Sequence, residues 1–501
     1  MMIILAIDQG TTGTKCMCFD RDQKPLSSVG MEFKQYYPHP GWVEHDAEEI
    51  WESTLSTARR ALDEAGAGPE QVAAVGITNQ RETTVLWDRE TGRPVRPAIV
   101  WQCRRSAGIC ERCREDGLER LFHDRTGLIL DPYFSGTKLA WVMENEPELA
   151  GRAEAGELCF GTIDSWLLYR LSGGKVHATD VSNASRTLLF NIHDLAWDSE
   201  LAGLLGVPME ILPEVKESSG VFGQVDPEAF LGITAPVAGV AGDQQAALFG
   251  QACFHPGMTK NTYGTGSFVL MNIGASPLLS DSGLLTTVAW SLGGKVSYAL
   301  EGSIFITGAA VNWLRDGLGI ISSPSELEGL ASRVADTGGV YFVPAFVGLG
   351  APYWDPSARA LIIGMTRGTE RAHIARAVIE SMALQTADVM EVMQGDASIP
   401  LRELRVDGGA SVMDLLLQYQ ADLLEVPVLR PVISETTALG AAMLAGLGVG
   451  LWKDLDEVET GWRLDRKAVP NADAAERCRG MRRDWKRAVE RCLGWVQGEE
   501  E

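Results

Sequence analysis

This 501-residue sequence has few basic residues relative to acidic ones. Its 44 Lys and Arg residues stand against 67 Asp and Glu residues, which gives a net charge of −23. Nucleic acids and anionic membranes select basic surfaces, so we expect neither as a partner. A site that handles phosphate must then make its positive field locally, from backbone amides, a few Lys or Arg side chains and Mg²⁺.

Long apolar runs and paired cysteines are also scarce. The longest apolar window, Thr437 to Trp452, is rich in Ala and Gly and is short for a membrane span, so it predicts a buried helix. The sequence enters a predicted strand without a basic leader, and we expect no signal peptide. Nine cysteines, an odd number, are scattered along the chain, which is typical of a reduced, cytoplasmic protein. Cys103, Cys110 and Cys113 have a metal-like spacing, but no second pair or histidine is near, which disfavours zinc.

The length allows two to four domains, and the 45% hydrophobic and 22% charged residues are those of an ordinary globular protein. Short apolar runs that predict buried strands alternate with stripes of helical period, such as Trp51, Leu55, Ala58 and Leu62. This alternation predicts an α/β fold. We place the main domain boundary near Gln251, which gives domains 1–250 and 251–501.

The stretch Ile3 to Lys15 organises the first domain. It begins as a continuous apolar run, as a strand buried on both faces does, and ends in Asp8, a charge that a strand core does not accept. Gly10 and Gly13 permit positive φ, so several N–H groups can point into one hollow. The spacing is not that of a P-loop. Amides and Lys15 could hold phosphate oxygens while Asp8 holds Mg²⁺; the alternative is an ordinary hairpin with a polar turn.

The second domain opens on a similar element. Thr259 to Thr262 predicts a strand, Gly264-Thr265-Gly266 a turn, and Phe268 to Asn272 a returning strand. Recurrence of strand, Gly/Thr turn and strand predicts two similar α/β domains that face each other across a cleft, each with one phosphate clamp.

Asp243 follows a short apolar strand and precedes a predicted helix, Ala246 to Gly250. Asp is common as a helix cap, and that is the ordinary interpretation. The chemical interpretation is a general base that takes the proton from a substrate hydroxyl as it attacks the γ-phosphate. Together with Asp8 and the two Gly/Thr turns, the pattern favours the base.

Arg81 and Glu82 leave a predicted buried strand inside a short polar block. The Arg fork donates and the carboxylate accepts, so side by side they can bind adjacent hydroxyls of a small polyol; the alternative is a solvated ion pair of little energetic value. Trp101 and Phe268 could form an apolar wall, although aromatic residues at strand ends are more often core. Tyr133 could add a hydroxyl contact.

Further glycines follow or open predicted elements. Gly409, between the strand Leu404 to Asp407 and a helix predicted at Val412 to Leu424, suits a close approach of a nucleotide, and Gly308 opens another predicted helix. Each is weak evidence by itself.

Taken together these motifs resemble the FGGY carbohydrate kinases, and within that family the branch that phosphorylates glycerol. The matching strings run nearly from end to end: DQGTTGTK, YPHPGWVEHD, GITNQRETT, IVWQCRR, DPYFSGTK, NASRTLLFNIH, AGDQQAALFGQ, KNTYGTGSF, VPAFVGLGAPYWDP, VDGGAS and TALGAA. The resemblance implies two ribonuclease-H-like (actin-like ATPase) domains around a catalytic cleft. It also implies transfer of the ATP γ-phosphate to a terminal hydroxyl of glycerol, giving sn-glycerol 3-phosphate, and a homo-oligomer, either dimer or tetramer.

The resemblance also implies roles residue by residue. The catalytic base falls on Asp243, and Mg²⁺ falls near Asp8 and Asp243. The implied glycerol contacts are Arg81, Glu82, Tyr133, Asp243 and Gln244, with Trp101 and Phe268 as the apolar side. The implied ATP contacts are Thr11, Thr12, Gly13, Lys15, Thr265, Gly308, Asn312 and Gly409, with Met413 at a position where other members often have a nucleotide-binding Asn.

Departures from the family pattern concern affinity and regulation. Asn312 is shorter than the Gln common there, and Met413 cannot make the polar contact of an Asn. Both differences affect the expected affinity for the adenine or ribose of the nucleotide, and not the reaction. The segment Gln224 to Ile233 lacks both the Gly-rich, Arg-bearing loop for fructose 1,6-bisphosphate and the phosphorylatable His, so we predict neither form of regulation. A kinase for another polyol or ketose, such as xylulose or gluconate, is the alternative enzyme. An ATP-driven conformational clamp is the alternative from another class.

Overall fold

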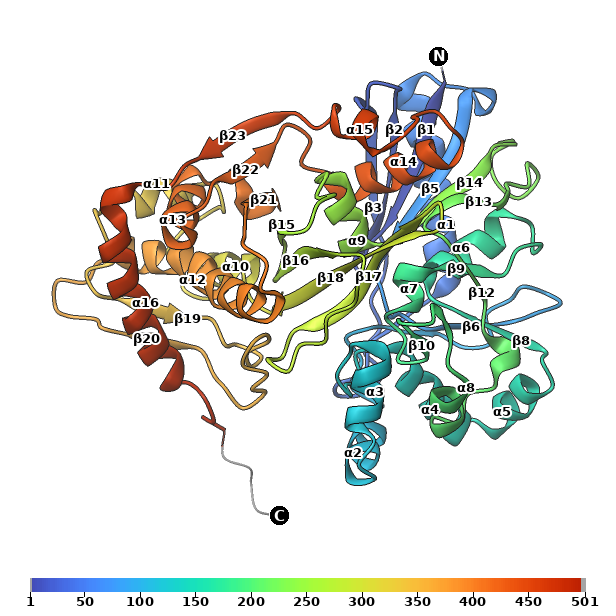
Figure 1. Cartoon of the computed structure of the whole chain (residues 1–501), viewed down its shortest axis with the longest axis horizontal. Coiled ribbons are helices and arrows are strands. Elements are labelled where there is room, and N and C mark those ends of the chain that lie inside the picture. Colours follow the sequence, from blue (N-terminus) through green and yellow to red (C-terminus); the bar gives the residue numbers. More distant parts are fainter. Residues whose placement is uncertain (1, 497–501) are drawn as a thin grey trace.

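The computed structural model describes residues 2–496, which form two halves, each built on a mixed β-sheet with helices packed against it (Figure 1). The first sheet has six strands in the order β13-β14-β5-β1-β2-β3. Strand β1 pairs antiparallel with β2 and parallel with β5, and β14 is parallel to β5. The bounds are β1 Ile3–Gln9, β2 Gly13–Phe19, β3 Pro25–Glu32, β5 Val72–Asn79, β13 Ser219–Gln224 and β14 Pro236–Gly242.

The second sheet repeats this pattern. Its seven strands run β17-β18-β16-β15-β21-β22-β23, with β15 antiparallel to β16, parallel to β21, and β21 parallel to β22. Strand β17, at the edge of the second sheet, has no counterpart in the first sheet. The predicted pair of similar α/β domains is therefore confirmed. The bounds are β15 Met258–Tyr263, β16 Ser267–Gly274, β17 Leu285–Leu292, β18 Lys295–Ile304, β21 Glu403–Gly408, β22 Val428–Pro431 and β23 Leu464–Ala468.

Strand β1 is buried on both faces, as its uninterrupted apolar run predicts. Ile3, Leu5 and Ile7 share a core with helix α1 (Ala47–Ala65). Ile4 and Ala6 face the opposite way and share a core with helix α14 (Thr436–Gly448). A helix from the second half of the sequence thus covers the sheet of the first half, as Figure 1 shows beside β1 and β2.

Helix α14 also packs tightly on helix α9 (Asp243–Gly250), and glycines make this approach feasible. A Cβ atom on Gly440 would lie 1.9 Å from the carbonyl oxygen of Ala246, and one on Gly250 would lie 2.0 Å from that of Thr436. Real Cβ atoms do not approach oxygen so closely, so both positions require glycine. This packing fixes the helix that carries Asp243.

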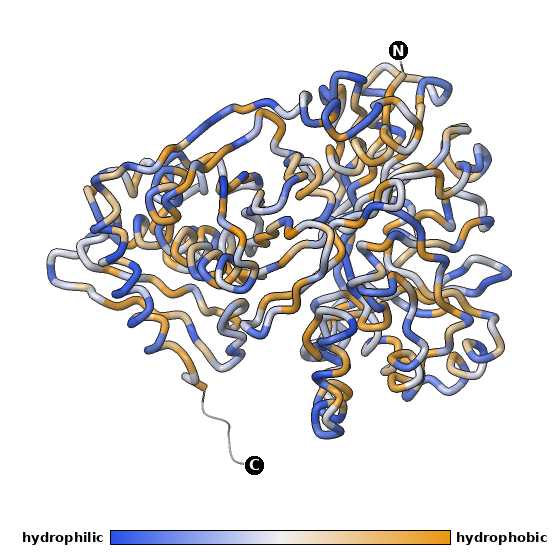
Figure 2. Tube along the Cα trace, viewed as in Figure 1, coloured by the Kyte–Doolittle hydropathy of each residue, from blue (hydrophilic) through white to orange (hydrophobic). Residues whose placement is uncertain are grey.

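Most of the remaining helices cover the second sheet and the lower part of the first half, whereas α6 (Ile163–Leu171) and α15 (Leu455–Glu459) pack against the first sheet. Helix α12 (Arg371–Ala397) is buried along most of its length, whereas the outer helix α16 (Ala475–Glu490) is mostly hydrophilic and buries one side (Figure 2). The others are α2 Ala107–Glu115, α3 Glu119–Thr126, α4 Ser135–Asn145, α5 Pro147–Glu154, α6 Ile163–Leu171, α7 Val181–Ala184, α8 Ser199–Leu204, α10 Gly308–Asp316, α11 Glu326–Ala331, α13 Asp414–Leu424 and α15 Leu455–Glu459.

Some predicted bounds were wrong. The helix predicted at Ala246 begins three residues earlier, at Asp243, and the one predicted at Val412 begins at Asp414 after a 3₁₀ turn, Gly409–Val412. In both cases the backbone turns into a helical conformation directly after the strand. The spacing of apolar residues does not show where such a transition begins. Within residues 2–496, no helix is long and apolar enough to cross a membrane. Of the predicted domains 1–250 and 251–501, residues 1 and 497–501 lie outside the described residues.

Three parallel strands end together at one edge of the first sheet. Asp8 of β1 lies opposite Thr78 of β5, and Gly242 of β14 lies opposite Asn79 of β5. The residues at or just after these strand ends, Asp8, Arg81 and Asp243, therefore meet at that edge. In open α/β sheets this is where ligands bind.

Candidate active site

The first hairpin forms as predicted, but its glycines act differently. The Gly10 N–H donates to the Gly13 carbonyl over 2.9 Å and closes the turn between β1 and β2. Neither glycine has a positive φ, so that part of the prediction was wrong. Crowding explains Gly13 instead, since a Cβ there would lie 2.7 Å from the Met31 carbonyl oxygen of β3.

The second hairpin is joined to the start of helix α10. The Gly264 N–H donates to the Gly266 carbonyl over 2.8 Å, and the N–H groups of Gly308 and Ala309 donate to the carbonyls of Gly264 and Thr265 over 3.0 Å each. A Cβ on Gly308 would lie 2.5 Å from the Gly264 oxygen. Thr265 is exposed at the tip. Because these N–H groups of α10 are already paired, the exposed Thr265, and not the helix N-terminus, is the group at this hairpin that suits phosphate oxygens.

Asp243 is the first residue of α9 rather than its cap, because Gly242 holds the capping position. Its Oδ1 accepts a hydrogen bond from its neighbour, the Gln244 N–H, over 2.7 Å, and lies 3.3 Å from Arg81 Nε. The side chain is 29% exposed. Burial raises the pKa of Asp243, while Arg81 and Lys260 oppose that rise. A partly open carboxylate with a raised pKa is suited to accept a proton from a bound hydroxyl.

Asp8 lies near enough to Asp243 for the two carboxylates to interact electrostatically. Burial, then the charge of Asp243, raises the pKa of Asp8 to about 7, and Lys15 acts in the opposite direction. Two nearby carboxylates repel each other, and a cation bound between them removes that repulsion. No group of three or more His, Cys, Asp or Glu side chains that could hold a metal exists within residues 2–496. Mg²⁺ is usually held by one or two carboxylates plus water and phosphate oxygens, so Asp8 and Asp243 fit it.

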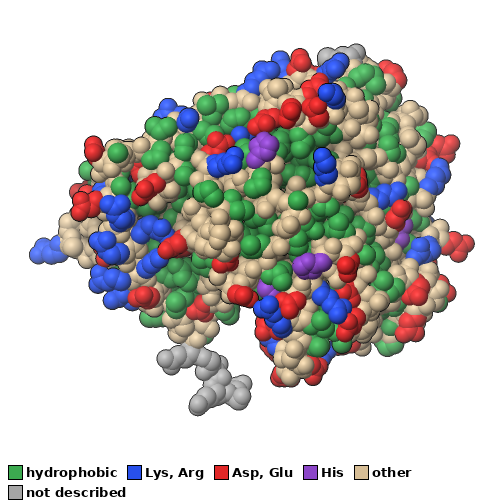
Figure 3. All heavy atoms as spheres, in the orientation of Figure 1, with side chains coloured by type: hydrophobic (Ala, Val, Ile, Leu, Met, Phe, Trp, Pro, Cys, Tyr) green, Lys and Arg blue, Asp and Glu red, His purple; other side chains and the backbone are tan. Residues whose placement is uncertain are grey.

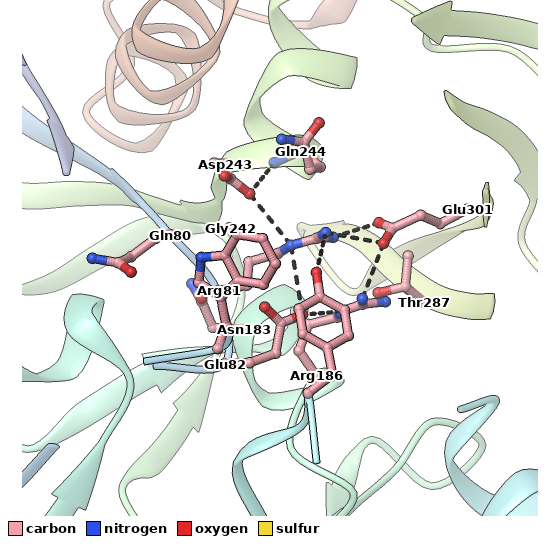
Figure 4. Close-up of polar contacts among 12 residues, drawn as sticks. Gln80, Arg81, Glu82, Asn183, Arg186, Gly242, Asp243, Gln244, Thr287 and Glu301 are labelled. Carbon is pink, nitrogen blue, oxygen red and sulfur yellow. Dashed lines mark hydrogen bonds and ion pairs between the residues drawn. The ribbon is translucent and has the colours of Figure 1, made fainter. Parts of the chain in front are cut away.

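Arg81 and Glu82 are buried in an ion network and do not form the open pair that the sequence suggested (Figure 4). Arg81 Nη1 and Nη2 donate to the two carboxylate oxygens of Glu301 over 2.5 and 2.9 Å. Arg186 Nε donates to Glu82 Oε1 over 2.7 Å. Glu301 thus occupies the end of the Arg81 fork, a partner that the sequence did not indicate.

Glu82 has a φ of 61°, a conformation that non-glycine residues seldom adopt. Burial raises the pKa of Glu82, and the charges of Arg81 and Arg186 oppose the rise. Backbone strain of this kind persists only where the surroundings enforce it, and it concentrates at functional sites.

Two of the three predicted aromatic residues contact Arg81, and the third, Trp101, packs against one of them. Tyr133 Oη is 3.5 Å from Arg81 Nη2, and the Phe268 ring lies 5.9 Å from the Arg81 guanidinium carbon. Trp101 contacts the Tyr133 ring edge-on at 5.5 Å and donates its Nε1–H to Thr11 Oγ1 over 2.9 Å. Trp101 therefore connects the predicted polyol pocket with the first hairpin.

Gln244, the predicted neighbour of the base, receives a hydrogen bond from a buried lysine. Lys260 Nζ donates to Gln244 Oε1 over 2.5 Å and to Thr262 Oγ1 over 2.9 Å. Burial lowers the pKa of Lys260 to about 8, with Asp407 and Asp243 opposing the shift. Because Lys260 belongs to β15, this contact ties the base-bearing helix α9 to the strand that leads into the second hairpin.

The other predicted nucleotide residues lie at different depths. Thr12, Asn312 and Gly409 are exposed, whereas Met413 is 7% exposed and packs in the core of the second half. Lys15 Nζ forms an ion pair with Glu435 Oε2 at 2.6 Å, with both side chains about a third exposed (34% and 40%). Lys15 is therefore paired, and the remaining donors of its partly exposed ammonium group can reach a phosphate oxygen.

Sequence reasoning missed Glu301, Arg186 and Lys260. Each is a charge inside a buried segment: Glu301 lies in β18, Lys260 in β15, and Arg186 follows helix α7. An isolated charge in an otherwise apolar or uncharged strand is costly to bury, and that was the available signal.

Comparisons with known proteins agree with this geometry. The N-terminal domain of the FGGY family of carbohydrate kinases matches residues 3–250, and its C-terminal domain matches residues 259–449. Glycerol kinase 2 of Thermotoga maritima is 59% identical over 495 residues, 99% of each chain, and glycerol kinase of Trichlorobacter lovleyi is 58% identical over 497 residues, covering 99% of this chain and 100% of its own. The crystal structure of Plasmodium falciparum glycerol kinase with ADP superposes with a TM-score of 0.91 at 36% identity, covering 99% of each chain. Xylulose kinase of Lactobacillus acidophilus has the same fold, with a TM-score of 0.88 at 22% identity, covering 97% of each chain. These matches, the paired sheets and the two Gly/Thr hairpins show that this chain belongs to the FGGY family of carbohydrate kinases.

Proposed function

We propose that this enzyme transfers the γ-phosphoryl group of ATP to a terminal hydroxyl of glycerol, giving sn-glycerol 3-phosphate. The observation that carries the proposal is the 59% identity over 99% of both chains to a protein named glycerol kinase 2. The contacts of Tyr133 and Phe268 with Arg81, and of Trp101 with Tyr133, support a polyol site, since they bring polar groups and aromatic rings together.

The proposed site has a substrate side and a nucleotide side, and different residues act on each. On the substrate side, Asp243 takes the hydroxyl proton onto its carboxylate, while Arg81, Glu82, Tyr133 and Gln244 orient the polyol. On the nucleotide side, the amides and hydroxyls of the two hairpins, with Lys15, hold the phosphate oxygens, and Gly308 and Gly409 permit a close approach. ATP would supply the phosphoryl group, and bound Mg²⁺ would neutralise part of the negative charge on its phosphate oxygens. Asp8 and Asp243 are the proposed Mg²⁺ ligands.

Other features of the enzyme are part of the same proposal. The nine cysteines are all free and buried, which supports a cytoplasmic location. The net charge of −23 supports the absence of a nucleic-acid partner, and the face in Figure 3 carries both basic and acidic side chains. We propose a dimer or tetramer by family resemblance, to be measured by light scattering in solution. Regulation by fructose 1,6-bisphosphate is not expected, and inhibition by that compound would contradict this.

The test is an assay of ADP formation with and without glycerol, followed by a panel that includes xylulose and gluconate. ADP formation that depends on glycerol, with sn-glycerol 3-phosphate as the product, is the expected result. A preference for a ketose or sugar acid would overturn the substrate assignment. A steady ATPase rate that ignores every polyol would instead favour the ATP-driven clamp.

A further inference from the structure

A buried carboxylate from the second half of the chain holds the predicted substrate arginine of the first half. Glu301 is 0% exposed and lies in strand β18. Its Oε2 accepts from Arg81 Nη1 over 2.5 Å, and its Oε1 accepts from Arg81 Nη2 over 2.9 Å and Arg186 Nη2 over 3.0 Å. One carboxylate thus binds two arginines, in the cluster drawn in Figure 4.

The donors of Arg81 show which of its edges remains for a ligand. Nη1 also donates to Gln245 Oε1 over 3.2 Å, so this nitrogen is fully used between Gln245 and Glu301. The longer contacts of the guanidinium are Nη2 to Tyr133 Oη at 3.5 Å, and Nε to Asp243 Oδ1 at 3.3 Å and to Glu82 Oε1 at 3.7 Å. Contacts of this length are weak and can be exchanged for a ligand hydroxyl, whereas the short bonds to Glu301 are not.

The same cluster fixes Glu82. Arg186, with 0% exposure, donates to Glu82 Oε1 through Nε and to Glu301 through Nη2, so it spans the two carboxylates. Burial favours the neutral form of Glu301, but Arg186 and Arg81 outweigh that effect and lower its pKa to about 2. Buried ion clusters contribute little net stability for the desolvation they require, so a role in fixing geometry explains this one better than a role in stability.

We propose that Glu301 is a positioning residue for substrate recognition: by engaging both terminal nitrogens of Arg81, it leaves only the Nε and Tyr133-facing edge of that guanidinium for the polyol hydroxyls. This inference rests on the proposed function for the identity of the substrate. Glu301 and Arg81 come from different halves of the chain, so the pair is also a contact between the two halves.

The test compares Glu301→Gln and Glu301→Asp with the wild-type enzyme. Gln keeps the shape but cannot bind two terminal nitrogens as a carboxylate does, and Asp keeps the charge with a shorter reach. The matched control is Glu380→Gln, which removes another buried carboxylate paired with an arginine, Arg376 at 2.8 Å, from helix α12. Thermal melting checks that each variant is folded, and E301D provides the test if E301Q does not fold.

We expect E301Q to raise the KM for glycerol by about tenfold or more, with the KM for ATP within about twofold of wild type. E301D should fall between E301Q and wild type, and E380Q should leave both KM values unchanged. An unchanged glycerol KM in E301Q, or equal increases for glycerol and ATP, would overturn the proposal.

A crystal structure of folded E301Q, or of E301D if only that folds, gives a readout that needs no turnover. The Arg81 guanidinium should leave its present position, and an Arg81 that stays in place would overturn the positioning role. If instead the wild-type enzyme ignores glycerol, the proposed function fails, while the position of Arg81 in the variant still decides the role of Glu301.

Discussion

Replacing Asp243 with Asn removes the proposed base with the least change in shape. Asn retains an oxygen that can accept the Gln244 N–H bond, now 2.7 Å long, and can still face Arg81 Nε, now at 3.3 Å. The glycerol pocket is otherwise made by Arg81, Glu82 and Tyr133, which the substitution leaves in place. We therefore expect the KM for glycerol to change by less than about threefold, because binding depends on groups that remain.

The loss should appear in kcat. General base catalysis by a positioned side chain contributes about 10²–10⁴-fold, or about 3–5 kcal/mol of transition-state stabilisation. Part of the rate survives because phosphoryl transfer depends largely on positioning and charge stabilisation, which the hairpins provide. The expected result is a kcat lower by about 10²–10⁴-fold.

The measurement is ADP formation at saturating glycerol and ATP, with Mg²⁺ titrated to separate loss of a base from loss of a metal ligand. Asp226→Asn is the matched control, since Asp226 is 22% exposed, paired with Lys175 at 2.8 Å, and follows β13 where that strand lies beside the start of β14, the end opposite to Asp243. Its kcat should stay within about twofold of wild type. A D243N enzyme that keeps more than about a tenth of the wild-type kcat, or regains it at high Mg²⁺, would refute the base assignment.

Three further variants test other parts of the structure. Gly308→Ala places a Cβ 2.5 Å from the Gly264 oxygen, so the second hairpin must move; the KM for ATP should rise by about tenfold with little change for glycerol, and equal increases would contradict this. Gly440→Ala places a Cβ 1.9 Å from the Ala246 oxygen and should lower the free energy of unfolding by about 1–3 kcal/mol or more in denaturant titration, whereas an unchanged midpoint would show that α9 and α14 can separate freely. Asp8→Asn tests the raised pKa of Asp8. The unfolded carboxyl loses its proton near pH 3.8 and the folded one near pH 7, so wild-type stability falls across that window, and the Tm of D8N relative to wild type should rise from pH 4 to pH 7 and then level off. A Tm difference independent of pH would exclude that shift.

The spacing of apolar residues and glycines in the sequence was sufficient to predict the strands and turns that carry the site. The apolar run of β1 ending in Asp8, the two Gly/Thr turns and the strand before Asp243 all appear where the sequence predicts them. Strands buried on both faces and tight turns depend on residues close in sequence, so period and glycine spacing identify them. Asp8 and Asp243 were linked from the sequence, whereas the place of Arg81 at the same edge follows from the parallel pairing of β1, β5 and β14 in the structure.

The tertiary structure alone decided what those residues do to one another. Glu301 is 220 residues from Arg81 and Lys15 is 420 residues from Glu435, separations that no local pattern reports. The same holds for helix α14, which crosses back onto the first sheet. The sequence by itself determined which chemical groups the enzyme has and the strand ends on which they stand. Folding determined which charges are neutralised and which edge of Arg81 stays available, because pairing of buried charges depends on distances that only the packed chain sets.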